Sequence, residues 1–172
     1  MFSAYKRHYN PLYSKLVELS RTIFFYKKIL LNDNFETRIN LIFIHFSILL
    51  LIYKKKKEKF PQEIFDNIFL NIEYHIRELG YGDVAVNKKM KTLTRIFYDI
   101  LLKINQSKSV SFATNNKILK TYFDDSSVNN SILIEDLSVY FNIFYNFCFE
   151  LKTDSMLKGQ INFKHNIKNG CT

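Results

Sequence analysis

The side chains best able to do chemistry are scattered along the chain. The histidines stand singly, as His8, His45, His75 and His165. Metal binding needs ligands at close helical or loop spacing, and nucleophilic catalysis needs a nucleophile held beside a base. Neither pattern occurs, the two cysteines form no C-x-x-C unit, and no glycine-rich phosphate loop follows a strand pattern. The sequence therefore predicts no catalytic residue, no metal and no cofactor.

His45 is the histidine with the most distinctive setting, because it lies inside the apolar run 41–53. A histidine in such a run is more often a hydrogen-bonded core residue than a ligand. We expect its ring to bond a backbone carbonyl or an acidic neighbour such as Asp33.

Positive charge is the second chemical feature. The formal net charge is +9 and the pI is near 9.4, which predicts attraction to an acidic partner. The cations gather at 54–59 and at 88–95, and the candidate partner-binding residues are Lys54, Lys55, Lys88, Lys91 and Arg95. A docking face and a solvated outer face both remain open, because abundant Lys, Asn and Ile with little Ala also indicate a compositional bias.

The segment 77–84, Arg-Glu-Leu-Gly-Tyr-Gly-Asp-Val, holds two of the four glycines. We expect Gly80 to end a helix in the left-handed conformation that a side chain would penalise. Gly82 is expected to reverse the chain. Asp83 is expected to cap the next helix with its carboxylate.

This segment, the Asn87-Lys88-Lys89-Met90-Lys91 run and Phe97-Tyr98 resemble the ubiquinol–cytochrome c chaperone family, in a short bacterial-type form. The resemblance spans roughly residues 10–150 and is strongest at 77–98. Its motif residues, expected to be mainly structural, are Arg77, Glu78, Gly80, Gly82, Asp83, Lys89, Met90, Phe97 and Tyr98, with Arg38 and His45 upstream. Tyr81 and Asn87 depart from the family pattern and receive no family role.

The resemblance implies a non-catalytic assembly factor of ubiquinol–cytochrome c reductase that binds newly made cytochrome b. Relatives in mitochondria also engage a small helper protein and the ribosome, so ribosomal RNA is an expected contact and DNA is not. The expected location is the cytoplasm, or the mitochondrial matrix in a eukaryote, with peripheral contact at the inner membrane. Residues 1–10 carry no apolar signal region, so we expect no secretory signal.

An all-α fold should position these residues, because two prolines and four glycines leave few breaks. Apolar periodicity predicts about six helices in one compact domain over 1–151, with a frayed tail at 152–172. The expected helices cover 11–30, 35–53, 61–79, 84–104, 117–123 and 132–151. Loops are expected at 105–116 and 124–131. The third and fourth helices should pack as an antiparallel pair joined at Gly80 to Asp83.

The apolar run 41–53 also allows a membrane-dipping helix. Thirteen residues rise only about 20 Å, whereas a hydrocarbon core is about 30 Å thick. A central buried helix is therefore the favoured interpretation. On the fourth helix, Lys88, Lys91 and Arg95 fall opposite the apolar stripe at 100° per residue.

Two alternatives to an assembly factor remain. One is a basic helical protein that binds RNA or the ribosome, which would show affinity that falls steeply with salt. The other is a peripheral membrane protein that uses residues 41–53. Burial of that run would separate the membrane alternative from the others.

Overall fold

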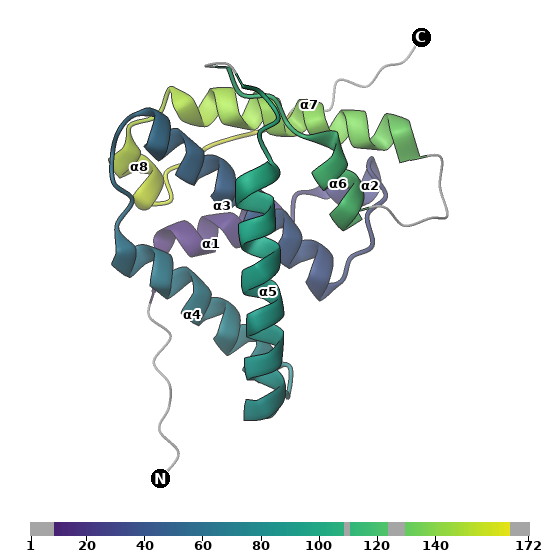
Figure 1. Ribbon diagram of the computed structural model, residues 1–172, viewed down its shortest axis with the longest axis vertical. Coiled ribbons are helices and arrows are strands. Elements are labelled where there is room, and N and C mark those ends of the chain that lie inside the picture. The colour runs from purple at the N-terminus through teal and green to yellow at the C-terminus, as the bar shows by residue number, and fades with distance from the viewer. Residues whose placement is uncertain (1–8, 109–110, 124–129, 166–172) are drawn as a thin grey trace.

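The computed structural model describes residues 9–108, 111–123 and 130–165, and these ranges are helical with no β-strand (Figure 1). A single isolated antiparallel bridge, Asn105 to Thr114, closes the loop after the fifth helix. His8 and Cys171 lie outside the described residues, as does most of the predicted loop at 124–131. The prediction of an all-α domain is confirmed.

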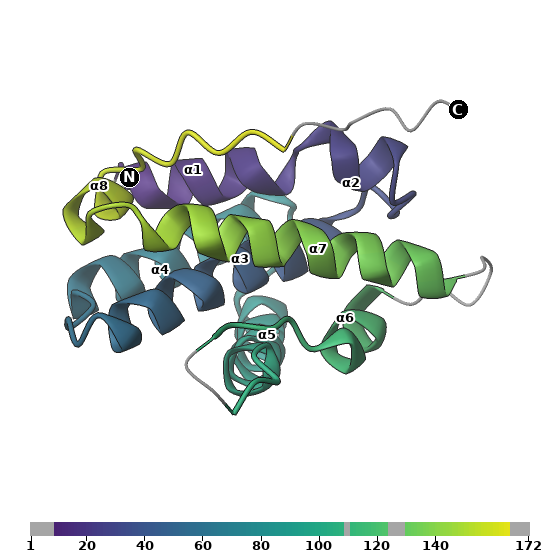
Figure 2. The same ribbon diagram turned by 90° about the horizontal axis from the view of Figure 1, so that it is seen from above.

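Helix α3 (Phe35–Lys55) forms the centre of the fold. Helices α1, α5 and α7 all pack on it; in Figure 2, α1 and α5 lie on opposite sides of it and α7 passes in front. Its residues from Ile39 to Leu49 are all buried, with Ile52 and Tyr53 after them. In the described part of the chain α3 alone is long and apolar enough to cross a membrane, yet 67% of that window is buried inside the protein. The expectation of a central buried helix is confirmed.

The predicted helix over 11–30 is wrong, because the chain forms α1 (Pro11–Ser20) and a separate short α2 (Ile23–Lys27). Asn10 caps α1 as expected, accepting the N–H of Tyr13 at 3.0 Å. The helix then stops because the hydroxyls of Ser20 and Thr22 bond the carbonyls of Val17 and Leu19, competing with the helical pattern.

The break rotates the buried face of the second segment. Phe24 and Phe25 enter the core, whereas Ile23 and Leu30, two apolar residues of the segment predicted as one helix, are exposed. Leu30 also takes a positive φ of 61°, so the chain turns sharply there.

The glycine corner joins α4 (Gln62–Glu78) to α5 (Asp83–Lys103). Gly80 has φ +92° just after the end of α4, as predicted. Gly82 has an ordinary φ of −75°, and it occupies the N-cap position that we expected Asp83 to fill. Asp83 is instead the first residue of α5, where its carboxylate pairs with Arg77. The two helices run in opposite directions and diverge from the corner (Figure 1).

An aromatic cluster holds α5 against α3 and α4. Phe97 is fully buried, with ring-centroid distances of 5.3 Å to Phe43 and 5.6 Å to Phe46 of α3. Its distance to Phe69 of α4 is 5.1 Å. Edge-to-face and stacked pairs of this kind add to the apolar burial that fixes the register of the three helices.

The remaining helices are α6 (Asn116–Phe123), α7 (Asn130–Phe149) and a short α8 (Thr153–Leu157). The frayed tail predicted from residue 152 is wrong through residue 165. Met156 and Ile161 are buried, and the ring of Phe163 lies 5.4 Å from that of Tyr140. Gly159, with φ +68°, fits against the start of α1, where a Cβ would lie 2.5 Å from the carbonyl oxygen of Pro11.

Candidate partner-binding surface

Helix α5 carries an exposed face between two grooves. Figure 2 views this helix nearly end-on, with α4 on one side and α6 on the other. We call the exposed face the α5 crest; it consists of Val84, Lys88, Lys91, Arg95, Tyr98 and Leu102. At 100° per residue these six side chains share one side of the helix. Val84 is 85% exposed and Leu102 79%, so the crest has apolar ends and a cationic middle.

The three cations of the crest have no acidic partner among the described residues. Other cations at the two ends of α5 are paired, since Arg77 binds Asp83 beside the corner and Lys103 binds Asp99 in the last turn. Free cations on one helical face keep their charge available for an external anion. Helical spacing of 100° per residue thus predicted correctly that Lys88, Lys91 and Arg95 lie opposite the buried residues of α5.

One groove lies between α5, α6 and the first turns of α3, and we call it the α3–α6 groove. Its volume is about 610 Å³. Its lining includes Phe35, Ala85, Lys88, Lys89, Leu93 and Ile96. Apolar side chains and two ammonium groups therefore meet in the same hollow.

The walls of the α3–α6 groove are tied to each other. The hydroxyl of Tyr122 donates to Asp99 at 2.7 Å, which fixes α6 to α5. Burial and this hydrogen bond raise the pKa of Tyr122 to about 12. Asn40 of α3 donates to the carbonyl of Tyr122 at 3.5 Å. The groove is consequently formed before any partner arrives.

The second groove separates α5 from α4 and is smaller, with a volume of about 330 Å³. Phe65, Phe69 and Met90 line it, together with the carboxylates of Asp66 and Glu73. Glu73 is held by Arg77 at 2.8 Å. The two flanks of the crest thus differ in charge, one with lysines and the other with carboxylates.

The lysine run after α3 is partly structural. The ammonium of Lys56 donates to the carbonyl of Leu151 at 2.6 Å and lies 5.4 Å from the ring of Phe149, so it secures the end of α7. Lys55, a candidate partner-binding residue, lies 5.3 Å from the ring of Tyr145. Lys54 remains exposed. This run therefore offers a partner fewer cations than the sequence suggested.

The motif residues of the corner mainly build the corner. Arg77 bonds Glu73 one turn earlier and reaches across to Asp83. Hydrogen bonds from its guanidinium to these two carboxylates raise the pKa of Arg77. Lys89 lies 4.6 Å from the ring of Tyr81, a cation–π contact that uses the residue to which no family role was given. Both Glu78 and Gly80 are exposed.

The apolar residues of the motif differ in how far they are buried. Phe97 is fully buried, Met90 is half-buried between α4 and α5, and Tyr98 is 47% exposed on the crest. Tyr98 and Met90 both line the groove beside α4. Among the motif residues, these two and Lys89 line the two grooves beside α5.

His45 is fully buried and neutral. Its Nδ1 lies 2.7 Å from the carbonyl oxygen of Leu41, which only accepts, so Nδ1 carries the proton. Its Nε2 then accepts from the hydroxyl of Tyr140 at 3.1 Å. Burial lowers the pKa of His45 to about 4. The backbone-carbonyl partner was predicted, whereas the acidic alternative, Asp33, was wrong.

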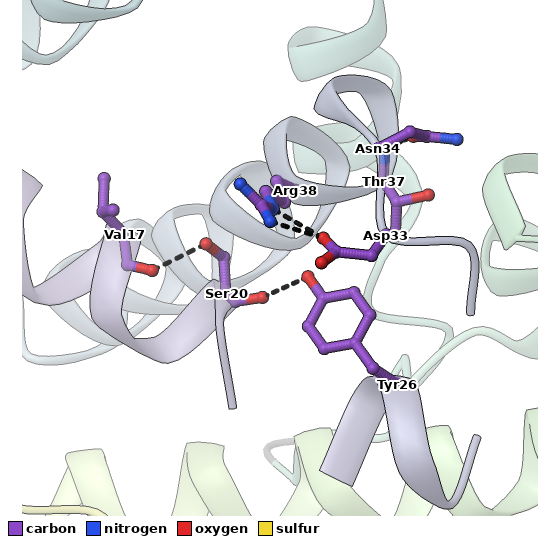
Figure 3. A network of polar contacts seen from close by, with 7 residues as sticks. All are labelled: Val17, Ser20, Tyr26, Asp33, Asn34, Thr37 and Arg38. Atoms are coloured by element: carbon purple, nitrogen blue, oxygen red, sulfur yellow. Dashed lines mark hydrogen bonds and ion pairs between the residues drawn. The ribbon is translucent and has the colours of Figure 1, made fainter. Parts of the chain in front are cut away.

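Asp33 belongs to another network, which joins the ends of α1, α2 and α3 (Figure 3). Its carboxylate accepts from Arg38 at 2.7 Å, while the hydroxyl of Tyr26 donates to the carbonyl of Ser20 at 2.6 Å. Burial, followed by the nearby charge of Asp33, raises the pKa of Tyr26. Arg38 thereby holds the loop before α3 against the first turn of that helix.

The described residues contain no group of three or more His, Cys, Asp or Glu placed to hold a metal ion. Cys148 is a free, fully buried thiol whose pKa is raised by that burial. Its side chain therefore behaves as a small apolar core residue.

The sequence did not predict the walls of the α3–α6 groove that lie outside α5. Phe35, Asn40 and Tyr122 approach Ile96 only because α3 and α6 meet beside α5. Half-buried aromatic residues at helix ends were the only available signal, and periodicity assigns such residues to the core by default.

The fold and this surface define an all-α protein with an exposed helical face that is both basic and apolar. A family model for the ubiquinol-cytochrome C chaperone matches residues 27–123, more than half of the chain. The chain therefore belongs to the ubiquinol–cytochrome c chaperone family, as its motif residues indicated.

Known structures support the same fold. The chain resembles the crystal structure of the Cbp3 homolog from Brucella abortus, with a TM-score of 0.65 and 22% sequence identity. The similarity covers 90% of this chain and 87% of that one. Comparison with curated protein sequences gives no significant match.

Proposed function

We propose that this protein is a non-catalytic assembly factor that binds newly made cytochrome b of ubiquinol–cytochrome c reductase. Family membership supports an assembly role for that complex. The observation that carries the binding role is the α5 crest, where three unpaired cations and exposed apolar side chains lie on the helix that contains the family motif. Such a face shields an apolar segment while its charges orient the partner.

The expected location follows from this role and is part of the proposal. The protein would act in the cytoplasm, or in the matrix of a mitochondrion, close to the membrane that receives cytochrome b. A helper protein and the ribosome are further proposed contacts. The burial of residues 41–53 argues against the alternative in which that run enters a membrane.

Deletion and co-purification test the proposal. We expect loss of the chain to lower the amount of assembled reductase, and a tagged chain to recover newly made cytochrome b. Normal reductase levels after deletion, with no cytochrome b recovered, would contradict the proposal.

A pair of charge-matched variants tests which cations matter. Lys88→Gln/Lys91→Gln/Arg95→Gln removes three positive charges from the crest, and Lys54→Gln/Lys57→Gln/Lys59→Gln removes three near the end of α3. Only the first is expected to lose cytochrome b, because its charges share one exposed face. The opposite result would move the binding surface to the end of α3.

A further inference from the structure

The α3–α6 groove combines three properties that a helical ligand would use. Phe35, Leu93 and Ile96 give it apolar walls. Lys88 and Lys89 place ammonium groups on its α5 side, and Glu36 places a carboxylate on its α3 side. An apolar hollow with opposite charges on facing walls favours a partner with a defined orientation.

The cations of this groove are available to a ligand. No carboxylate among the described residues pairs with Lys88. Lys89 contacts the face of Tyr81 at 4.6 Å, an interaction that an incoming carboxylate can replace because exposed cation–π contacts are weak. The positive charge on this side of α5 is therefore not neutralised by a carboxylate of the described residues.

We propose that the α3–α6 groove binds one amphipathic helix of a partner protein, with its apolar face on Phe35, Leu93 and Ile96 and its carboxylates toward Lys88 and Lys89. A helix suits the site because its apolar residues recur every three or four positions, which places acidic residues beside them on one flank. Glu36 sets the direction of the bound helix by favouring a basic or hydrogen-bond donor group on the other flank.

This inference rests on the proposed function, and it adds where a partner binds and which sequence pattern the partner segment carries. The groove is also distinct from the middle of the crest. Lys91 and Arg95 do not line it, although they belong to the same helix. A matched control comes from Lys57 and Lys59, which are exposed just after α3 and do not line the groove.

The test uses the full chain and synthetic helical peptides of about 18 residues, or five turns. The acidic peptide has leucines on one face and glutamates on its flank. A second peptide replaces the glutamates with lysines, and a third replaces the leucines with serines. We expect fluorescence anisotropy to show binding of the acidic peptide alone. Amide chemical-shift changes should lie at the groove.

Two charge variants locate the site. Lys88→Gln/Lys89→Gln should weaken binding of the acidic peptide about fivefold to thirtyfold, since each exposed ion pair contributes modestly. Lys57→Gln/Lys59→Gln removes the same charge from exposed residues outside the groove and should weaken binding less than about threefold. Equal losses in the two variants would show diffuse attraction and overturn the proposal.

Ala85→Trp tests the apolar part of the groove. Ala85 is exposed and lines the groove in the first turn of α5, so a large ring there fills the hollow without entering the core. We expect it to abolish peptide binding while circular dichroism and the melting temperature stay unchanged. Undiminished binding by this variant would contradict the proposal.

If the α3–α6 groove binds something other than a partner helix, the experiments give a different result. Groove-dependent self-association in sedimentation would show a second copy of this chain. Binding to vesicles that contain about one-third anionic phospholipid, lost in Lys88→Gln/Lys89→Gln while no peptide binds, would show a membrane surface. Either result overturns the proposal of a partner helix, as does failure of all three peptides to bind.

Experiments in cells separate this inference from the proposed function. If deletion abolishes reductase assembly and Ala85→Trp does not, the assembly role stands and the groove is not the binding site. If Ala85→Trp loses peptide binding and deletion leaves the reductase normal, the groove binds a helix and the assembly role fails.

Discussion

At the scale of the residue, protonation of His45 makes the stability of the folded core depend on pH. It is fully buried between the carbonyl of Leu41 and the hydroxyl of Tyr140, and its ring packs 4.7 Å from that of Phe144. A charged imidazolium there would lose water without gaining a carboxylate. The neutral ring is therefore part of the folded state, and protonation favours unfolding.

The lowered pKa of His45 predicts the direction in which the free energy of unfolding changes with pH. The pKa of His45 is about 4 in the folded protein and 6.5 for an exposed histidine, so the unfolded chain binds the proton first. Stability is fully present above pH 6.5 and is lost as the pH falls toward 4. Between pH 7 and pH 5 we expect a loss of about 2 kcal/mol in the free energy of unfolding from this group. Urea titrations at both pH values measure it.

The control for this prediction is His45→Gln, which removes the titrating group. The variant should lose much less stability between pH 7 and pH 5, whatever its absolute stability. His165→Gln provides a second control, because burial also lowers the pKa of His165, beside Phe24. An unchanged pH dependence in His45→Gln would show that another group is responsible.

At the scale of the element, the corner between α4 and α5 uses its two glycines in different ways. Gly80 needs its φ of +92°, whereas Gly82 has φ −75° and an N-cap position with no side-chain hydrogen bond. Neither glycine has an atom within 4 Å of the position a Cβ would take. Backbone conformation alone therefore separates them.

The same substitution should have opposite effects at these two positions. We expect Gly80→Ser to cost about 1–2 kcal/mol, because serine must adopt a left-handed conformation. Gly82→Ser should stabilise by about 0.5–1 kcal/mol, because its hydroxyl caps α5 and the unfolded chain loses freedom. Chemical denaturation of the two variants measures both. Destabilisation by Gly82→Ser would show that the corner requires glycine at both places.

The sequence predicts the long helices well because each buries a regular stripe against α3. It fails for α2 and α8, which are short and depend on particular local contacts. Thr22 interrupts a continuous apolar pattern through its hydroxyl, and Gly159 permits a close approach to Pro11 that periodicity does not encode. The crest follows from helical geometry, but the α3–α6 groove needs walls from residues far apart in the sequence.

At the scale of the whole molecule, residues 153–165 connect the first helix of the fold with the last long one, because they contact both α1 and α7. Figure 2 shows the chain after α8 running back along α1 and α7. Phe163 packs on Tyr140, and the hydroxyl of Tyr53 donates to the carbonyl of Thr153 at 2.8 Å. Along this seam between the C-terminal segment and α1, Gly159 lies against the backbone of Pro11.

Gly159→Ala should therefore loosen the seam. The new Cβ would lie 2.5 Å from the carbonyl oxygen of Pro11, and φ +68° is unfavourable for alanine. We expect a loss of about 2–3 kcal/mol and faster amide exchange in α1 and α8 than in α5. Lys158→Ala, at an exposed neighbour, should change stability by less than about 0.5 kcal/mol. Equal protection of α1 in both variants would contradict the prediction.

The seam between Gly159 and Pro11 also sets an order of events during synthesis. A ribosome makes α1 before residues 153–161, and α1 cannot complete its packing until those residues, which contact it, have emerged. Chains folding as they are made proceed from the N-terminus at about 5–20 residues per second. The nascent chain thus remains open at this edge until residues 153–161 have left the exit tunnel, well after α1 itself has emerged.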